Sequence, residues 1–172
     1  MAKDTKKSEK PAETEAKPAE AGAPATFNIL GQYIKDLSFE NPGAPNSNMM
    51  GGAQPDFSVS INVNAKKQAD DIYAVELTIN AEAKRDTTLM FNVELVYGGI
   101  FRVRNVPDNQ LPPLLMVECP RLLFPFARQV LSNVTQAGGF PPLLMEPVDF
   151  VAIYHQNLQQ AAQAANNGAK PN

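Results

Sequence analysis

The sequence contains one cysteine and one histidine among its 172 residues, and each shortage excludes a kind of site. A single cysteine, Cys119, cannot form an intrachain disulfide, and this usage is typical of a reducing compartment. A zinc site needs three or four good ligands, and Cys119 and His155 belong to no such cluster in the sequence. We therefore expect no metal site.

Excess basic charge, long apolar runs and nucleotide-binding motifs are also absent. The net charge is −3, which is not the electrostatic footprint of a nucleic-acid-binding protein. No apolar run approaches the roughly 20 residues of a membrane helix, and no apolar segment follows the first lysines as in a secretory signal. We expect a soluble, cytoplasmic protein that needs no cofactor, binds no nucleic acid and does not insert directly into a membrane.

Composition divides the chain into three parts. Residues 1–25 consist mainly of Lys, Glu, Ala and Pro, which cannot build a core, so we expect a disordered N-terminal tail. Residues 26–160 contain the apolar periodicity of one folded domain. Residues 161–172 are rich in Ala and Asn and are expected to form a flexible C-terminal tail.

Alternating apolar and polar residues predict antiparallel strands with one buried face each. The alternation covers residues 57–65, 73–83 and 89–97, and a further strand with a bulge near Gly31 is expected over residues 26–40. The pair Gly98-Gly99 suggests a bend or a bulge. The expected fold class is α+β, with a four-stranded antiparallel sheet in meander order and two helices on one face.

The long helix expected from about Pro120 is apolar around more of its circumference than one contact surface requires. At 100° per residue, one face contains Cys119, Leu122, Leu123, Phe126, Ala127, Val130 and Val134. Phe124 and Leu131 lie well round from this face. We expect one part to cover the sheet and the other to need another partner. Gly138-Gly139 should end this helix, and Pro147 should open the second one.

Acidic residues collect on the polar side of the expected sheet. Strand parity places Glu76, Glu82 and Glu94 there, and Asp36 and Glu40 are in phase with one another on the first strand. Such a surface attracts basic partners. From strand parity alone, the favoured explanation is a solubilising face that blocks edge pairing.

Several segments, in the same order along the chain, resemble the SecB family of bacterial protein-export chaperones. They are YIKDLSFENPGAP (33–45), GGIF (98–101), CPRLLFPFAR (119–128) and GGFPPLLMEPVDF (138–150). The resemblance implies an ATP-independent holdase that keeps preproteins unfolded in the cytosol and delivers them to SecA. It also implies a homotetramer, a dimer of dimers packed through the long helices, with Phe124, Arg128 and Leu131 at the oligomer interface.

The resemblance further implies two binding surfaces. The SecA-binding surface would comprise Asp36, Glu40 and Glu94, with Asn92 beside them where an apolar residue is expected. A groove for unfolded substrate would lie between the second strand, the loop before it and the connector between the helices. Its expected residues are Met49, Met50, Phe57, Val59, Ile61, Phe140, Leu143, Leu144 and Val148. The adaptable methionine side chains suit varied ligands, although they can also plug a core edge.

Two alternatives to an export chaperone remain at this stage. One is a small-ligand-binding or enzymatic α+β oligomer in which Cys119 or His155 is active, which requires their side chains to meet a substrate or one another. The other is a chaperone of the same fold dedicated to a toxin–antitoxin pair. A buried cysteine usually behaves as a small apolar side chain, so no catalytic residue is assigned.

Overall fold

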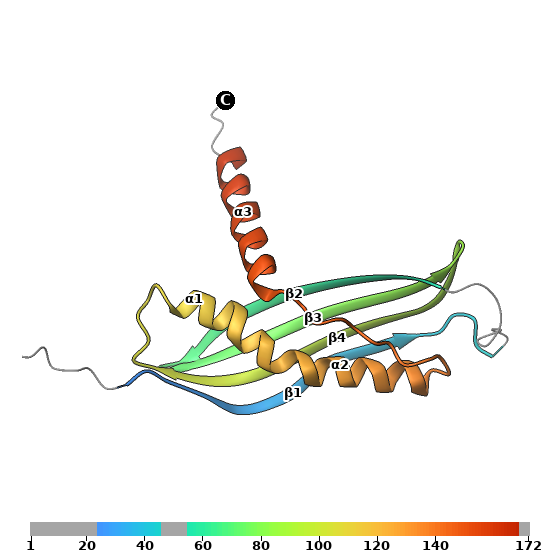
Figure 1. The fold of residues 1–172 in the computed structure, drawn as a ribbon, viewed down its shortest axis with the longest axis horizontal. Helices are drawn as coiled ribbons and strands as arrows, with labels where there is room; N and C mark the ends of the chain where they lie inside the picture. Colours follow the sequence, from blue (N-terminus) through green and yellow to red (C-terminus); the bar gives the residue numbers. More distant parts are fainter. Residues whose placement is uncertain (1–23, 46–54, 169–172) are drawn as a thin grey trace, which may run out of the picture.

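The computed structural model describes residues 24–45 and 55–168. Its elements are β1 (Thr26–Glu40), β2 (Asp56–Ala69), β3 (Ile72–Arg85), β4 (Thr88–Arg104), α1 (Leu111–Pro113), a π-helical turn η1 (Leu114–Glu118), α2 (Cys119–Ala137) and α3 (Phe150–Gly168). The strands form one long sheet, α2 lies along one face, and α3 projects away from it (Figure 1). The predicted four-stranded antiparallel sheet with a long helix and a C-terminal helix is confirmed. The predicted tail 1–25 falls almost entirely outside the described residues.

The order of the strands in the sheet is β1-β4-β3-β2, so the predicted meander is wrong for the first strand. β2, β3 and β4 do follow one another as hairpins, but β1 pairs antiparallel with β4, from Thr26 opposite Arg104 to Glu40 opposite Asn92. Alternation shows which side chains share a face, whereas it does not show which strands are neighbours. β1 and β2 are therefore the two edges of the sheet.

β1 contains two register shifts, one between Ile29 and Gly31 and one between Ile34 and Asp36. The first confirms the bulge predicted near Gly31. The bend or bulge predicted at Gly98-Gly99 is wrong, because β4 continues through both residues and its register with β3 does not shift there.

Gly98 and Gly99 instead allow two close approaches to β4. A Cβ atom at Gly98 would lie 2.5 Å from Tyr33 Cζ, and one at Gly99 would lie 2.7 Å from Leu123 Cδ2. The first glycine therefore accommodates an aromatic ring on the outer face of the sheet, and the second lets α2 approach the inner face.

The core lies between α2 and the inner face of the sheet. Leu77, Ile79 and Leu95 have no accessible surface, and neither do Leu123 and Leu131 of α2. Complete burial of one such side chain stabilises the fold by about 1.5–3 kcal/mol relative to exposure. These contacts fix α2 along the long direction of the sheet.

The face of α2 that packs on the sheet differs from the predicted one. Phe124 is 6% exposed and Leu131 is completely buried, whereas Leu122 and Phe126 are 41% and 52% exposed. The prediction that Phe124 and Leu131 lie at an interface between copies is wrong, because the core of one chain already encloses them. Phe124 also contacts Phe150 of α3, with ring centroids 5.8 Å apart.

The ends of the helices follow local chemistry. The turns before Cys119 are irregular as expected, with Pro112 and Pro113 in α1 followed by the π-helical turn. α2 ends at Ala137, and Gly139 has the positive φ of 86° that commonly ends helices.

The start of α3 was mispredicted, because Asp149 rather than Pro147 forms its cap. Asp149 Oδ1 accepts the backbone N–H groups of Val151 and Ala152, both at 3.0 Å. Pro147 belongs to the extended connector between α2 and α3. α3 was expected to lie on the sheet face beside α2, but it only starts there. Its first residue, Phe150, is buried, and Leu158 further along is 49% exposed.

Candidate functional site

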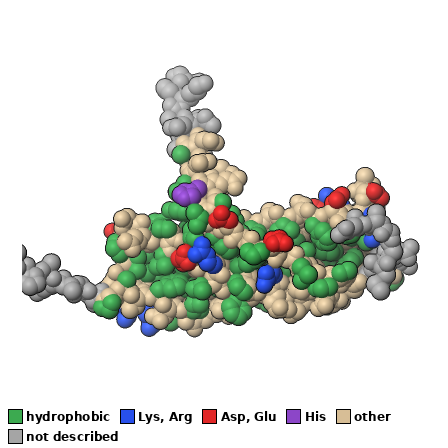
Figure 2. Space-filling model, viewed as in Figure 1, with side chains coloured by type: hydrophobic (Ala, Val, Ile, Leu, Met, Phe, Trp, Pro, Cys, Tyr) green, Lys and Arg blue, Asp and Glu red, His purple; other side chains and the backbone are tan. Residues whose placement is uncertain are grey.

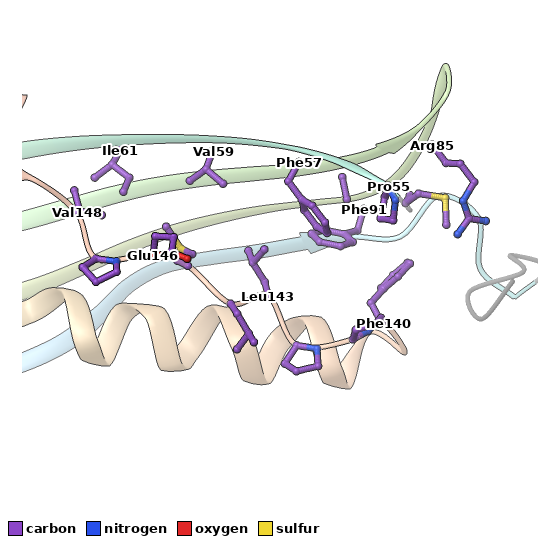
Figure 3. Close-up of a pocket in the computed structure, with 17 residues that line it drawn as sticks. Pro55, Phe57, Val59, Ile61, Arg85, Phe91, Phe140, Leu143, Glu146 and Val148 are labelled. Carbon is purple, nitrogen blue, oxygen red and sulfur yellow. The ribbon is translucent and has the colours of Figure 1, made fainter. Parts of the chain in front are cut away.

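A cavity of about 690 Å³ lies between β2, the beginning of β4 and the connector that follows α2. In Figure 3, side chains from β2 approach those of the connector across this space, and α2 runs beneath. The figure also shows Phe91 beside Phe57 at one end and Val148 below Ile61 at the other. We call this elongated space the groove.

The structure brings the described residues of the predicted substrate site to the walls of the groove. Those that line it are Phe57, Val59, Ile61, Phe140, Leu143, Leu144 and Val148. Met49 and Met50, which were predicted with them, lie outside the described residues. Binding of a substrate by these side chains stays a prediction.

The walls of the groove expose more apolar surface than folding of one chain requires. Phe57 and Val59 are 51% and 42% exposed because β2 is an edge strand that extends past the cover of α2. Leu144 on the opposite wall is 81% exposed. Figure 2 shows apolar side chains spread over this side of the molecule. Contiguous exposed apolar side chains commonly mark a binding surface.

Sequence reasoning missed part of the groove. The missed lining residues are Pro55, Ala83, Arg85, Met90, Phe91, Pro141, Pro142, Met145, Glu146 and Pro147. Phe91 could have been found from strand pairing, because Ala83 pairs with both Phe57 and Phe91 and all three share the inner face. That inference requires the strand order as well as the alternation.

The opposite, outer face of the sheet contains the predicted acidic residues. Ser38 pairs with Glu94, Glu40 with Asn92, and Asp36 with Val96, so these side chains share the outer face. Asp36, Glu40 and Glu94 are exposed. We call these three carboxylates and the neighbouring Asn92 the acidic face.

Two other carboxylates of the outer face are neutralised by lysines. Lys35 Nζ lies 2.8 Å from a Glu76 carboxylate oxygen, and Lys84 pairs with Glu82. Within residues 24–45 and 55–168, no ion pair involves Asp36, Glu40 or Glu94. Asp36, Glu40 and Glu94 therefore contribute uncompensated negative charge to this surface.

Cys119 is placed where an enzymatic role is difficult. Its side chain has no accessible surface, and burial raises the pKa of the thiol to about 12. The thiol is thus protonated at neutral pH and shielded from any substrate. His155 is exposed on α3, with its ring centroid 5.8 Å from that of Tyr154. Among the described residues, no group of His, Cys, Asp or Glu could hold a metal ion.

Comparison with known proteins agrees with this architecture. Residues 20–161 match the family model of the preprotein translocase subunit SecB. The chain belongs to the SecB family. The Protein-export protein SecB of a Bradyrhizobium species is 53% identical over 151 residues, covering 88% of this chain and 92% of the relative. That of Afipia carboxidovorans is 49% identical over 160 residues, covering 93% and 99%.

The fold also resembles a solved SecB-like structure. The Mycobacterium tuberculosis Rv1957 SecB-like chaperone, in complex with a ChAD peptide from the Rv1956 HigA1 antitoxin, superposes with a TM-score of 0.60. The match covers 71% of this chain and 90% of that one at 11% identity, so it concerns the fold alone. Membership of the SecB family makes this chain a protein-export chaperone.

The segments that resemble SecB correspond to the two surfaces described above. The segment KDLSFE, residues 35–40, forms the end of β1 and includes two carboxylates of the acidic face. GGFPPLLMEPVDF begins directly after α2, spans the connector and ends with the first residue of α3, and therefore supplies one wall of the groove. Among the helices of the described residues, none is long and apolar enough to cross a membrane.

Proposed function

We propose that this protein is an ATP-independent holdase of the cytoplasm, which binds unfolded preproteins in the groove and delivers them to SecA. The observation that supports client binding is the exposed apolar lining of the groove, formed by an edge strand and a proline-rich connector. An unfolded chain exposes apolar side chains that a native protein encloses, so such a surface distinguishes the two states.

Client affinity would arise from many small apolar contacts. Each methylene group transferred from water contributes about 0.8 kcal/mol, without a requirement for a particular sequence. Several grooves in one assembly would add avidity for a long client. No nucleotide hydrolysis is needed for such binding, and we assign the protein no enzymatic step.

SecA would bind the acidic face through basic side chains. The acidic face lies on the outer side of the sheet, whereas the groove opens on the inner side that carries α2. A client and SecA could therefore occupy one protomer at the same time. Uncompensated carboxylates would accelerate association and set its orientation.

The homotetramer would use the apolar side chains that remain exposed on β1 and α2. Ile29, Ile34 and Leu37 of β1 are 38–48% exposed. Leu122 and Phe126 of α2 are 41% and 52% exposed. β1 is also a sheet edge, which is suited to pairing with the same strand of a second copy. In this proposal, Leu122 and Phe126 replace Phe124 and Leu131 at the interface, whereas Arg128 lies on the other flank of α2 and contacts the connector.

Two titrations test the proposal. The protein is first sized by sedimentation, and is then titrated with a permanently unfolded preprotein and, separately, with SecA. We expect a tetramer that binds both. A chain that prevents aggregation of only one antitoxin, and not of several unrelated preproteins, would instead be a dedicated toxin–antitoxin chaperone.

A further inference from the structure

Thr135, in the last turn of α2, is a polar side chain that is completely buried. Its hydroxyl group both donates and accepts a hydrogen bond. Thr135 Oγ1 donates to the carbonyl oxygen of Leu131 or Ser132, each 3.0 Å away, and accepts the backbone N–H of Leu143 at 2.9 Å. The first contact is common for threonine within helices. The second reaches out of the helix to the connector.

Apolar packing of Phe140 and Leu143 holds the connector in the core, but few hydrogen bonds fix its register. It has no regular secondary structure, and Pro141, Pro142 and Pro147 have no N–H to donate. Two further hydrogen bonds join the connector to α2. The Phe140 N–H donates to the Thr135 carbonyl at 3.1 Å. Arg128 Nη1 donates to the Met145 carbonyl at 3.3 Å. Arg128 and Thr135 lie about two helical turns apart on α2.

The Thr135–Leu143 bond fixes which leucine faces the core. Leu143 is 7% exposed and Leu144 is 81% exposed, although both line the groove. Successive side chains of an extended segment point in opposite directions, so a shift by one residue would exchange the two. The bond holds the backbone at Leu143 against α2, and this places Leu143 in the floor and leaves Leu144 at the rim.

We propose that Thr135 is a positioning residue for client binding, which keeps the connector in place as a preformed wall of the groove. The proposal rests on the groove being the client site. Without the hydroxyl, the N–H of Leu143 loses its partner in a buried location and the connector detaches more often. A client would then have to order this wall as it binds, which lowers affinity.

The test compares Thr135→Val, which has nearly the same shape without a hydroxyl, with Thr135→Ser, which retains the hydroxyl. Amide hydrogen exchange at Leu143 should become roughly tenfold faster in Thr135→Val and change little in Thr135→Ser. The affinity for a reduced, carboxymethylated α-lactalbumin should fall several-fold in Thr135→Val only. Thr78→Val, on the half-buried outer face of β3, is the control and should change neither quantity.

The outcomes separate the positioning role from the groove itself. Unchanged exchange at Leu143 in Thr135→Val would overturn the positioning role, as would faster exchange with unchanged client affinity. If the unmodified protein does not bind the unfolded probe at all, the assignment of the groove fails. Exchange at Leu143 then still decides whether Thr135 holds the connector. Circular dichroism of each variant identifies one that does not fold, and Thr135→Ala then replaces Thr135→Val.

Discussion

Lys35 on β1 forms a two-pronged contact with Glu76 on β3, across the intervening strand β4. The distances from Lys35 Nζ to the two carboxylate oxygens are 2.9 and 2.8 Å, and this hydrogen bonding raises the pKa of Lys35. Lys35 is the extra residue at the second bulge of β1, between Ile34 and Asp36. The bulge therefore places the Lys35 ammonium group beside the acidic face. There it neutralises the negative charge of Glu76.

Replacing Lys35 with methionine should strengthen SecA binding. Glu76 then becomes a further uncompensated carboxylate on the same face of the sheet as Asp36, and the dissociation constant should fall roughly two- to fivefold at low salt. The gain should disappear as salt increases. Lys66→Met provides the control, because it changes net charge equally on the same face and Lys66 forms no ion pair within the described residues. Equal effects of both substitutions would refute the role of the Lys35–Glu76 pair.

Charge reversal on the acidic face should have the opposite effect. In the double variant Asp36→Lys, Glu40→Lys, SecA binding should weaken by roughly tenfold or more, since attraction becomes repulsion. Affinity for an unfolded preprotein should be unchanged, because the groove opens on the other side of the sheet. The control reverses Asp70 and Asp108, exposed carboxylates outside the acidic face. Loss of preprotein binding in the double variant would show that this surface is misassigned.

The two classes of apolar residue on α2 should respond differently to substitution. Leu131→Ala should lower the free energy of unfolding by about 2–5 kcal/mol because it creates a cavity in the core. The double variant Leu122→Glu, Phe126→Glu should leave each protomer folded and reduce the assembly, because these side chains are exposed in one chain. Sedimentation and thermal unfolding measure the two effects. A tetramer that survives the double variant would contradict the proposed interface.

Cys119 should behave as a structural side chain. Because burial raises the pKa of its thiol to about 12, iodoacetamide should modify the native protein at pH 8 far more slowly than the unfolded protein. Cys119→Ser should retain client binding and lose about 1–3 kcal/mol of stability through a buried, poorly paired hydroxyl. A folded Cys119→Ser protein without chaperone activity would favour the enzymatic alternative.

Local alternation made the faces of the strands predictable. Asp36 and Glu40 could be assigned to one side of β1, and Phe57, Val59 and Ile61 to one side of β2, because successive side chains of a strand alternate. Glu94 was assigned to the polar side of β4 in the same way. These assignments depend only on residues close in sequence.

The features that sequence did not reveal depend on distant contacts. The pairing of β1 with β4 is a choice among strands with similar alternation. The buried face of α2 could not be selected, because apolar side chains surround most of the helix and the sheet determines which of them it encloses. Gly98 and Gly99 were misread as a bend, since Tyr33 and Leu123, which need the space, are distant in sequence.

The most direct test of client binding changes both walls of the groove without disturbing the core. Val59 and Leu144 are exposed on opposite walls, so Val59→Asp, Leu144→Asp should fold normally. Calorimetric titration with reduced, carboxymethylated α-lactalbumin should give an affinity roughly tenfold or more below that of the unmodified protein. Leu158→Asp, at an exposed apolar site on α3, should bind as the unmodified protein does, and SecA binding should be constant throughout. An unchanged affinity in the groove variant would contradict the account.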